Sequence, residues 1–71
     1  MNKTEAVAIA AQFGRDQGYD PVLYTADAAK KASRWQIDFR RRATHKPGPG
    51  DFFTVYVNAT SKSAYRLVPG K

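Results

Sequence analysis

The sequence predicts an α+β domain in which one N-terminal helix packs on one face of a three- or four-stranded antiparallel β-meander. Two observations lead to this fold class. Apolar residues recur at helical spacing near the N-terminus, and apolar and polar residues alternate in segments of the second half, as they do in strands with one buried face. With 71 residues, the chain is close to the lower limit for a single hydrophobic core. Residues 1–71 are therefore expected to form a single small domain.

Residues 3–14 are predicted to form the helix. Asn2 suits the N-cap position, and Glu5 follows it three residues later, as in a capping box. Either Gly14 or Gly18 would end the helix. The apolar stripe that faces the sheet is narrow and rich in alanine, so we expect the helix to lie close against its partner surface; it consists of Ala6, Ile9, Ala10 and Phe13.

Alternation predicts strands over residues 35–42, 52–58 and 64–68. Between the first two lies THKPGPGD, whose prolines and glycines interrupt regular structure, and between the last two lies the polar turn TSKS. One short helix covers only one face of such a sheet. The face beneath the helix is predicted to contain Trp35, Ile37, Phe39, Phe53, Val55, Val57, Tyr65 and Leu67.

Residues 19–33 carry conflicting signals. Asp20-Pro21 is a good helix start, because Asp caps and Pro suits the first helical position, but the same pair also marks turns. Residues 22–25, VLYT, have the composition of a strand. We prefer a strand over about residues 22–28 followed by a turn through residues 30–33. If this segment is not a strand, the order of elements is αβββ instead of αββββ.

The positive charge is concentrated in one part of the chain. The net charge is +6, and residues 30–46 contain seven basic residues and a single acidic one, Asp38. Basic and acidic residues cancel in the rest of the sequence. This distribution favours a localised basic surface. The run Arg40 to Arg42 also has a structural explanation, since charge on an edge strand discourages unwanted strand pairing.

The face of the sheet away from the helix is the candidate binding surface. It mixes arginine with aromatic side chains, which suits a protein partner or unstacked bases, although solvated sheet faces also carry such residues. Ala64 and Val68 are expected on this face too. The candidate binding residues are Arg40, Arg42, Tyr56, Phe52 and Arg66, with Arg34, Lys30 and Lys31 adding electrostatic steering.

No pattern of catalytic or metal-binding residues stands out. The chain has no cysteine, and its one histidine, His45, lies in the Pro/Gly-rich segment without a positioned nucleophile. We therefore expect a non-enzymatic protein without metal or cofactor, and Trp35 is assigned to the core. The apolar run 6–11 is too short to cross a membrane, and Glu5 argues against a signal peptide, so a cytoplasmic location without membrane contact is expected.

The strand pattern resembles that of PepSY-type and related cystatin-like small domains. Their first strand typically reads W-x-V-x-F, as do Trp35, Ile37 and Phe39 here, and a later strand reads V-x-V-D-x-x-T-G-x-V. Two departures are Asn58 in place of the usual Asp and Ser61-Lys62 in place of the usual Gly. The second motif is matched by Val55, Val57, Asn58, Thr60 and Tyr65-Arg66-Leu67.

The resemblance implies a helix followed by a short antiparallel sheet, and a module that binds or inhibits other proteins. The first functional hypothesis is accordingly a small binding module, an inhibitor or accessory factor, that meets an acidic protein through the uncovered face. Two alternatives stay open at this point. One is a nucleic-acid binder that uses Arg40–Arg42 and the sheet aromatics, and the other is a domain that associates with itself through the same face.

Overall fold

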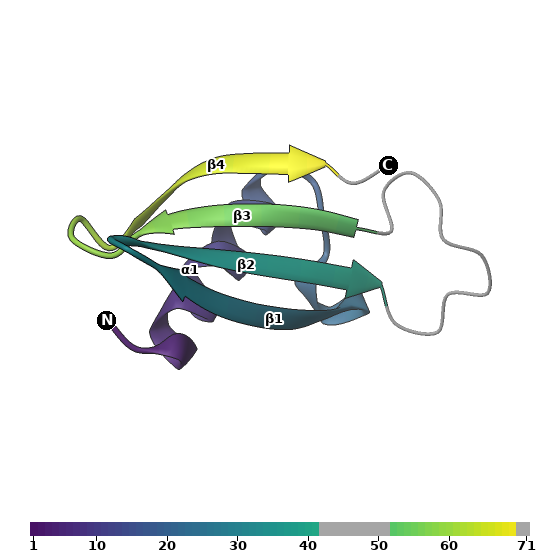
Figure 1. Cartoon of the computed structure of the whole chain (residues 1–71). Helices are drawn as coiled ribbons and strands as arrows, with labels where there is room; N and C mark the ends of the chain where they lie inside the picture. The colour runs from purple at the N-terminus through teal and green to yellow at the C-terminus, as the bar shows by residue number, and fades with distance from the viewer. Residues whose placement is uncertain (42–51, 70–71) are drawn as a thin grey trace.

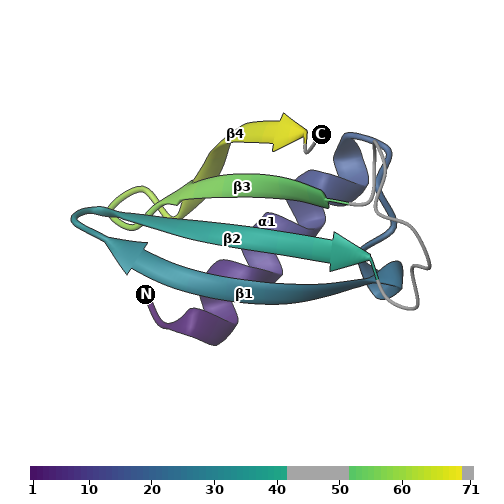
Figure 2. The same ribbon diagram turned by 45° about the vertical axis from the view of Figure 1, so that its right-hand side comes forward.

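The computed structural model describes residues 1–41 and 52–69, which form a helix lying across an antiparallel sheet (Figure 1). Each strand pairs with the next along the chain, so the sheet is a meander of order β1-β2-β3-β4. Helix α1 runs behind the sheet in both views (Figures 1 and 2). The predicted α+β architecture is confirmed. Its elements are α1 (Lys3–Asp16), the 3-10 turn η1 (Pro21–Leu23), β1 (Tyr24–Lys31), β2 (Arg34–Arg41), β3 (Phe52–Asn58) and β4 (Ser63–Pro69).

Helix α1 begins and ends where local chemistry favours it. Oδ1 of Asn2 accepts a hydrogen bond from the backbone N–H of Glu5 at 2.8 Å, which satisfies one of the free N–H groups of the first turn. At the other end, Gly18 has a φ of 98°, a conformation that glycine adopts without strain. Gly18, not Gly14, therefore ends the helix. Gly14 is buried within α1 instead.

The ambiguous segment resolves into a short turn and then a strand. Oδ1 of Asp20 accepts from the N–H of Val22 at 3.1 Å, and Pro21 stands at the start of η1. The helix-start signal is thus real, but it produces only one 3-10 turn before β1. The strand begins and ends later than the predicted 22–28, and the turn into β2 is shorter than predicted. It consists of Ala32 and Ser33, with Ala32 at a φ of 54°.

The expected assignment of residues to faces fails at one place in β4. Tyr56 lies opposite Arg66 but Val57 lies opposite Ala64, so Tyr65 is an extra residue at a β-bulge. The bulge reverses the alternation for the residues before it. Ala64 therefore packs against the core instead of lying on the uncovered face, and Tyr65, predicted to be buried, is 51% exposed.

The core is centred on Phe53, which is 1% exposed. Its ring stacks on Phe39 at a centroid distance of 4.5 Å and on Tyr19 at 4.2 Å, and Tyr24 meets it edge-on at 4.9 Å. A Cβ atom on Gly14 would lie 3.1 Å from Cε2 of this ring. The absence of a side chain at Gly14 therefore lets α1 approach the sheet closely. The rest of the buried core consists of Ala6, Ala10, Ile37, Val55 and Val57.

Replacing the two neighbouring phenylalanines should have very different effects on stability. We expect Phe53→Ala to lower the free energy of unfolding by about 3–5 kcal/mol, because it removes a fully buried ring from the cluster. Phe52→Ala, the matched control on the other face, should cost about 1 kcal/mol or less. Denaturant unfolding followed by circular dichroism measures both. Equal costs would contradict the assignment of the two rings to opposite faces.

Candidate binding face

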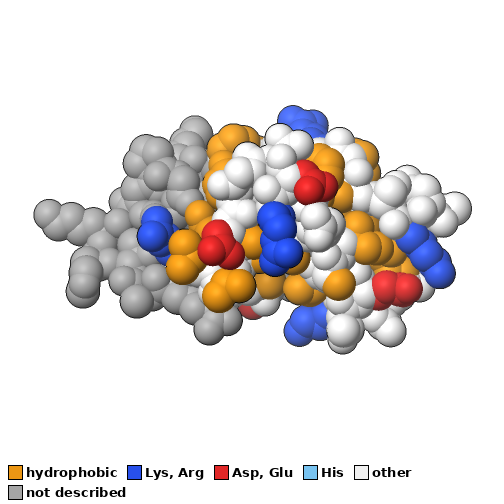
Figure 3. Space-filling view, turned by 180° about the vertical axis from the view of Figure 1, so that it is seen from behind, with side chains coloured by type: hydrophobic (Ala, Val, Ile, Leu, Met, Phe, Trp, Pro, Cys, Tyr) orange, Lys and Arg blue, Asp and Glu red, His pale blue; other side chains and the backbone are white. Residues whose placement is uncertain are grey.

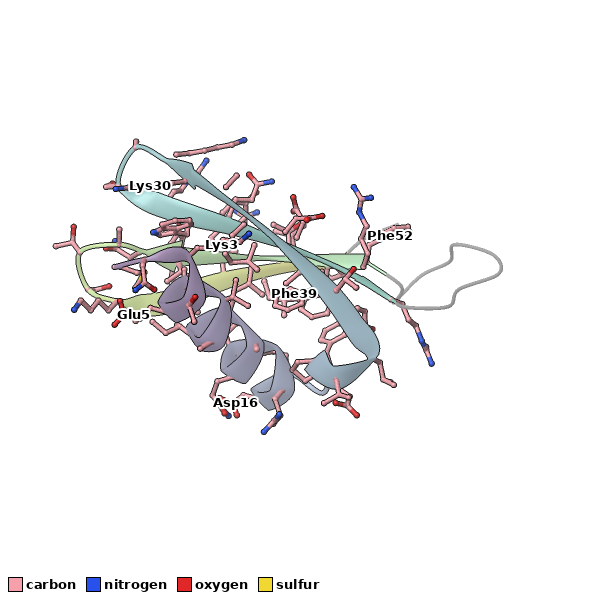
Figure 4. The ribbon with its side chains drawn as sticks, turned by 90° about the horizontal axis from the view of Figure 1, so that it is seen from below. Lys3, Glu5, Asp16, Lys30, Phe39 and Phe52 are labelled. Atoms are coloured by element: carbon pink, nitrogen blue, oxygen red, sulfur yellow. The ribbon has the colours of Figure 1, made fainter. Side chains whose placement is uncertain are left out.

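The face of the sheet that α1 leaves uncovered, called the open face below, is defined by the register of the strands. Residues directly opposite each other on paired strands project to the same side. Figure 4 shows Phe39 between the sheet and α1, and Phe52 on the opposite side. The open face contains Thr25, Asp27, Ala29 and Lys31 of β1, Arg34, Gln36, Asp38 and Arg40 of β2, Phe52, Thr54, Tyr56 and Asn58 of β3, and Ser63, Arg66 and Val68 of β4.

Two arginines and two tyrosines form a cluster on the β3–β4 side of this face, called the Arg–Tyr cluster below. Cζ of Arg34 lies 4.9 Å from the centroid of the Tyr56 ring, which is a cation–π contact. The Tyr65 ring lies beside Tyr56, with centroids 6.3 Å apart and planes inclined by 30°. Arg66 is directly opposite Tyr56. The β-bulge thus adds a second ring to a site where strict alternation would have placed one.

Next to this cluster, Asp38 is held by neighbouring polar side chains. Its Oδ1 accepts a hydrogen bond from Oγ1 of Thr54 at 2.7 Å, and Nε2 of Gln36 lies 3.3 and 3.4 Å from its two oxygens. Asp38 is therefore already supplied with donors from the open face. Asp27 lies directly opposite it on β1 and is exposed.

Like charges face each other twice between β1 and β2. Asp27 is opposite Asp38, and Lys31 is opposite Arg34. Cross-strand pairs of like charge destabilise a sheet, while opposite charges at the same positions stabilise it. Neither pair contributes to folding stability through its charges.

The arginine run divides between the two sides of the sheet. Arg40 projects onto the open face opposite Phe52, as predicted. Arg41 is opposite Tyr24, which is buried on the helix side. Arg42 lies outside the described residues. Arg40 and Arg41 therefore do not form one continuous basic surface. β2 is an inner strand, so the predicted protection of a sheet edge by this run is wrong. Within the described part of the chain, Arg40 and Arg66 have no ion-pair partner.

The other predicted binding residues are also split between the faces. Lys31 and Arg34 lie on the open face, whereas Lys30 is opposite Trp35 on the helix side. Trp35 is half-buried against the core, in agreement with its assigned role. Its indole N–H is buried without a hydrogen-bond acceptor among the described residues.

Among the described residues, the helix side offers no comparable basic surface. In Figure 3, basic, acidic and apolar side chains are interspersed over it. Two shallow hollows lie between α1 and β4, with volumes of about 330 and 280 Å³. Phe13 borders both, and Tyr65 and Leu67 of β4 border the larger one.

Comparisons with known proteins provide no assignment for this face. The chain matches no protein-family model, and neither curated proteins nor solved structures show significant similarity to it. No helix among residues 1–41 and 52–69 is long and apolar enough to cross a membrane. The same residues contain no group of three or more His, Cys, Asp or Glu side chains placed to hold a metal ion.

Sequence reasoning identified most of the Arg–Tyr cluster but not Tyr65. The alternation of AYRLV placed this ring in the core, and the sequence carries no recognisable signal of the bulge. The importance of Asp27 was also missed, because its position opposite Asp38 depends on the register of a two-residue turn. The exposure of Tyr65 and the position of Asp27 both depend on how the strands pair.

Removing the carboxylate of Asp27 should stabilise the isolated chain. We expect Asp27→Lys to raise the free energy of unfolding by about 0.2–1 kcal/mol, because the introduced ammonium group would face Asp38 across the strands. Asp27→Asn, the matched control, removes the repulsion without adding attraction and should give a smaller gain. Chemical denaturation at low protein concentration and low salt measures both. A loss of stability in both variants would contradict the repulsion.

Proposed function

We propose that this protein is a small binding module, an inhibitor or accessory factor, whose open face binds an acidic segment of another protein. The Arg–Tyr cluster is the main contact. The observation that carries this proposal is the guanidinium of Arg34 lying 4.9 Å from the Tyr56 centroid, beside a second, largely exposed tyrosine.

The cluster has the chemistry of a protein-binding hot spot. Tyrosine and arginine are enriched among residues that dominate interface energies, because they combine apolar area with hydrogen-bonding groups. An arginine stacked on a ring keeps its in-plane N–H groups available, and these match the two oxygens of a carboxylate. Arg66, without an ion-pair partner among the described residues, adds a second cation beside the rings.

The surroundings of the cluster favour a short acidic segment over a long charged polymer. Asn58 and Gln36 border it. Oδ1 of Asn58 accepts from the N–H groups of Thr60 and Ser61, and Nε2 of Gln36 lies beside Asp38, so a peptide backbone would meet the other atom of each amide, Nδ2 of Asn58 and Oε1 of Gln36. Towards β1, however, the carboxylates of Asp38 and Asp27 lie side by side across the face. A phosphate backbone that crossed the whole sheet would meet this acidic pair, whereas a peptide seated over β3 and β4 would avoid it.

Nucleic acid is the second candidate, and the exposure of Tyr65 favours it. A tyrosine that is 51% exposed beside arginines provides a ring on which a base can stack. In this case Phe52 and Arg40, directly opposite each other at the other end of β3, would form a second stacking position. The two candidates share residues but differ in the ligands they predict.

Fluorescence anisotropy with three labelled probes in the same buffer tests the proposal. The probes are a glutamate-rich peptide containing one leucine and one tyrosine, the same peptide with lysine in place of glutamate, and a mixed-sequence single-stranded oligonucleotide. We expect the acidic peptide to bind most tightly. Tyr65→Ser and Arg34→Gln should each raise its dissociation constant about five- to thirtyfold, as loss of a hot-spot residue does.

Lys3→Gln is the matched control, because it removes one positive charge from the exposed part of α1. It should leave binding of the acidic peptide almost unchanged. The second candidate would replace the proposal if the oligonucleotide bound more tightly than the acidic peptide. In that case its affinity should fall steeply as the salt concentration is raised, and its binding should be lost in Tyr65→Ser. Binding of none of the probes at low salt would overturn both.

A further inference from the structure

The two edges of the sheet differ in how readily they can accept another strand. β4 is interrupted by the bulge at Tyr65 and ends at Pro69, two features that discourage strand addition. β1 instead pairs with β2 over all eight of its residues without irregularity. Figure 4, seen from the β1 side of the molecule, shows this strand running along the edge. None of the other described strands pairs with its outer side.

We propose that β1 pairs antiparallel with β1 of a second copy of this chain, so that two four-stranded sheets join into one around a twofold axis at Ala29. A symmetric pairing of this kind is self-complementary, because each copy presents the same strand to the other. The inference goes beyond the proposed function and does not rest on it. It leaves the open face uncovered in both copies.

The charges of β1 select the register. Residues that lie opposite each other must project to the same face of the sheet. The twofold axis therefore has to lie between the two copies of one residue, and not between two successive residues. With the axis at Ala29, Asp27 of each copy lies opposite Lys31 of the other, which gives two pairs of opposite charge. With the axis at Asp27, two carboxylates would face each other, and with the axis at Ala28, neither charge would meet its opposite. Ala29 is small and exposed, so two copies of it can meet at the axis.

This register also accounts for the two like-charge pairs within the monomer. Asp27 faces Asp38 on one side but would face Lys31 of the second copy on the other. Lys31 likewise faces Arg34 within its own chain and would face Asp27 across the new interface. The β1 member of each unfavourable pair thus gains an opposite neighbour. A strand edge that served only to repel would carry a single sign of charge.

Apolar and small side chains flank this edge. Val22 and Leu23, immediately before β1, are 71% and 43% exposed and would lie next to the β1–β2 turn of the second copy. On α1, the hollow lined by Ile9 and Asp16 marks the β4 side of the helix. Helical spacing places small side chains on the opposite flank, towards β1, where they would permit the two helices to approach across the axis. These are Thr4, Val7, Ala8 and Ala11.

Sedimentation equilibrium on the full chain and two charge-reversal variants tests the proposal. The wild-type protein should associate to a dimer with increasing concentration. Asp27→Lys and Lys31→Glu should each raise the dimer dissociation constant at least about tenfold, because each variant places like charges opposite each other at both positions. An equimolar mixture of the two variants should recover a dimer. In the mixed pair the two introduced side chains face each other with opposite charges, and the remaining Asp27 faces the remaining Lys31.

Misfolding of the variants cannot account for the expected loss of the dimer. Asp27→Lys places a cation opposite Asp38, and Lys31→Glu places an anion opposite Arg34, so each variant replaces a repulsive pair within its own sheet by an attractive one. Lys62→Glu, which changes the net charge as Lys31→Glu does but from the exposed turn between β3 and β4, is the matched control and should remain dimeric. A wild-type chain that is monomeric at about 1 mM would overturn the proposal. A mixture of the two variants that stays monomeric would overturn it as well.

Discussion

The close approach of α1 to the sheet at Gly14 and Phe53 is the contact on which the rest of the structure depends. A Cβ atom at Gly14 would lie 3.1 Å from the Phe53 ring, and that ring also packs against Phe39, Tyr19 and Tyr24. One side chain therefore joins the helix, the segment after it and two further strands. In a chain of 71 residues, where burial is limited, such a shared contact fixes the side of the sheet that is covered. The open face is what this choice leaves exposed.

The charges of the open face have little to do with stabilising the fold. Asp38 is provided with donors by Thr54 and Gln36, but Asp27 opposite it and Lys31 opposite Arg34 face like charges. The sheet tolerates these pairs because the apolar side of the same strands is well buried. Positions that weaken an isolated domain are reasonable places to look for interactions with other molecules.

The proposed binding face and the proposed dimer use different parts of the sheet. The Arg–Tyr cluster extends from Arg34 of β2 over β3 and β4, whereas the strand pairing involves the outer side of β1. If both hold, the joined sheet presents two copies of the cluster on one continuous surface. Two sites on one rigid body would bind a partner with repeated acidic segments more tightly than one site alone.

Local patterns in the sequence were sufficient for the fold class, the helix and three of the strands. Asn2 and Glu5 predict the start of α1, and the alternation around Ile37 and Val55 predicts which residues of β2 and β3 are buried. These features could be predicted because capping and alternation act between residues close in sequence. The basic segment was also visible, and so was most of the Arg–Tyr cluster.

Tertiary structure decided the features that depend on how separate strands pair. The bulge at Tyr65 shifts the register of β4, and so moves one aromatic ring out of the core and Ala64 into it. The short turn at Ala32 fixes the register of β1, which divides Lys30 from Lys31 and places Asp27 opposite Asp38. A shift of one residue transfers a side chain to the other face without changing the sequence pattern. The sequence alone therefore determined which side chains were present, and pairing between distant segments decided which of them meet.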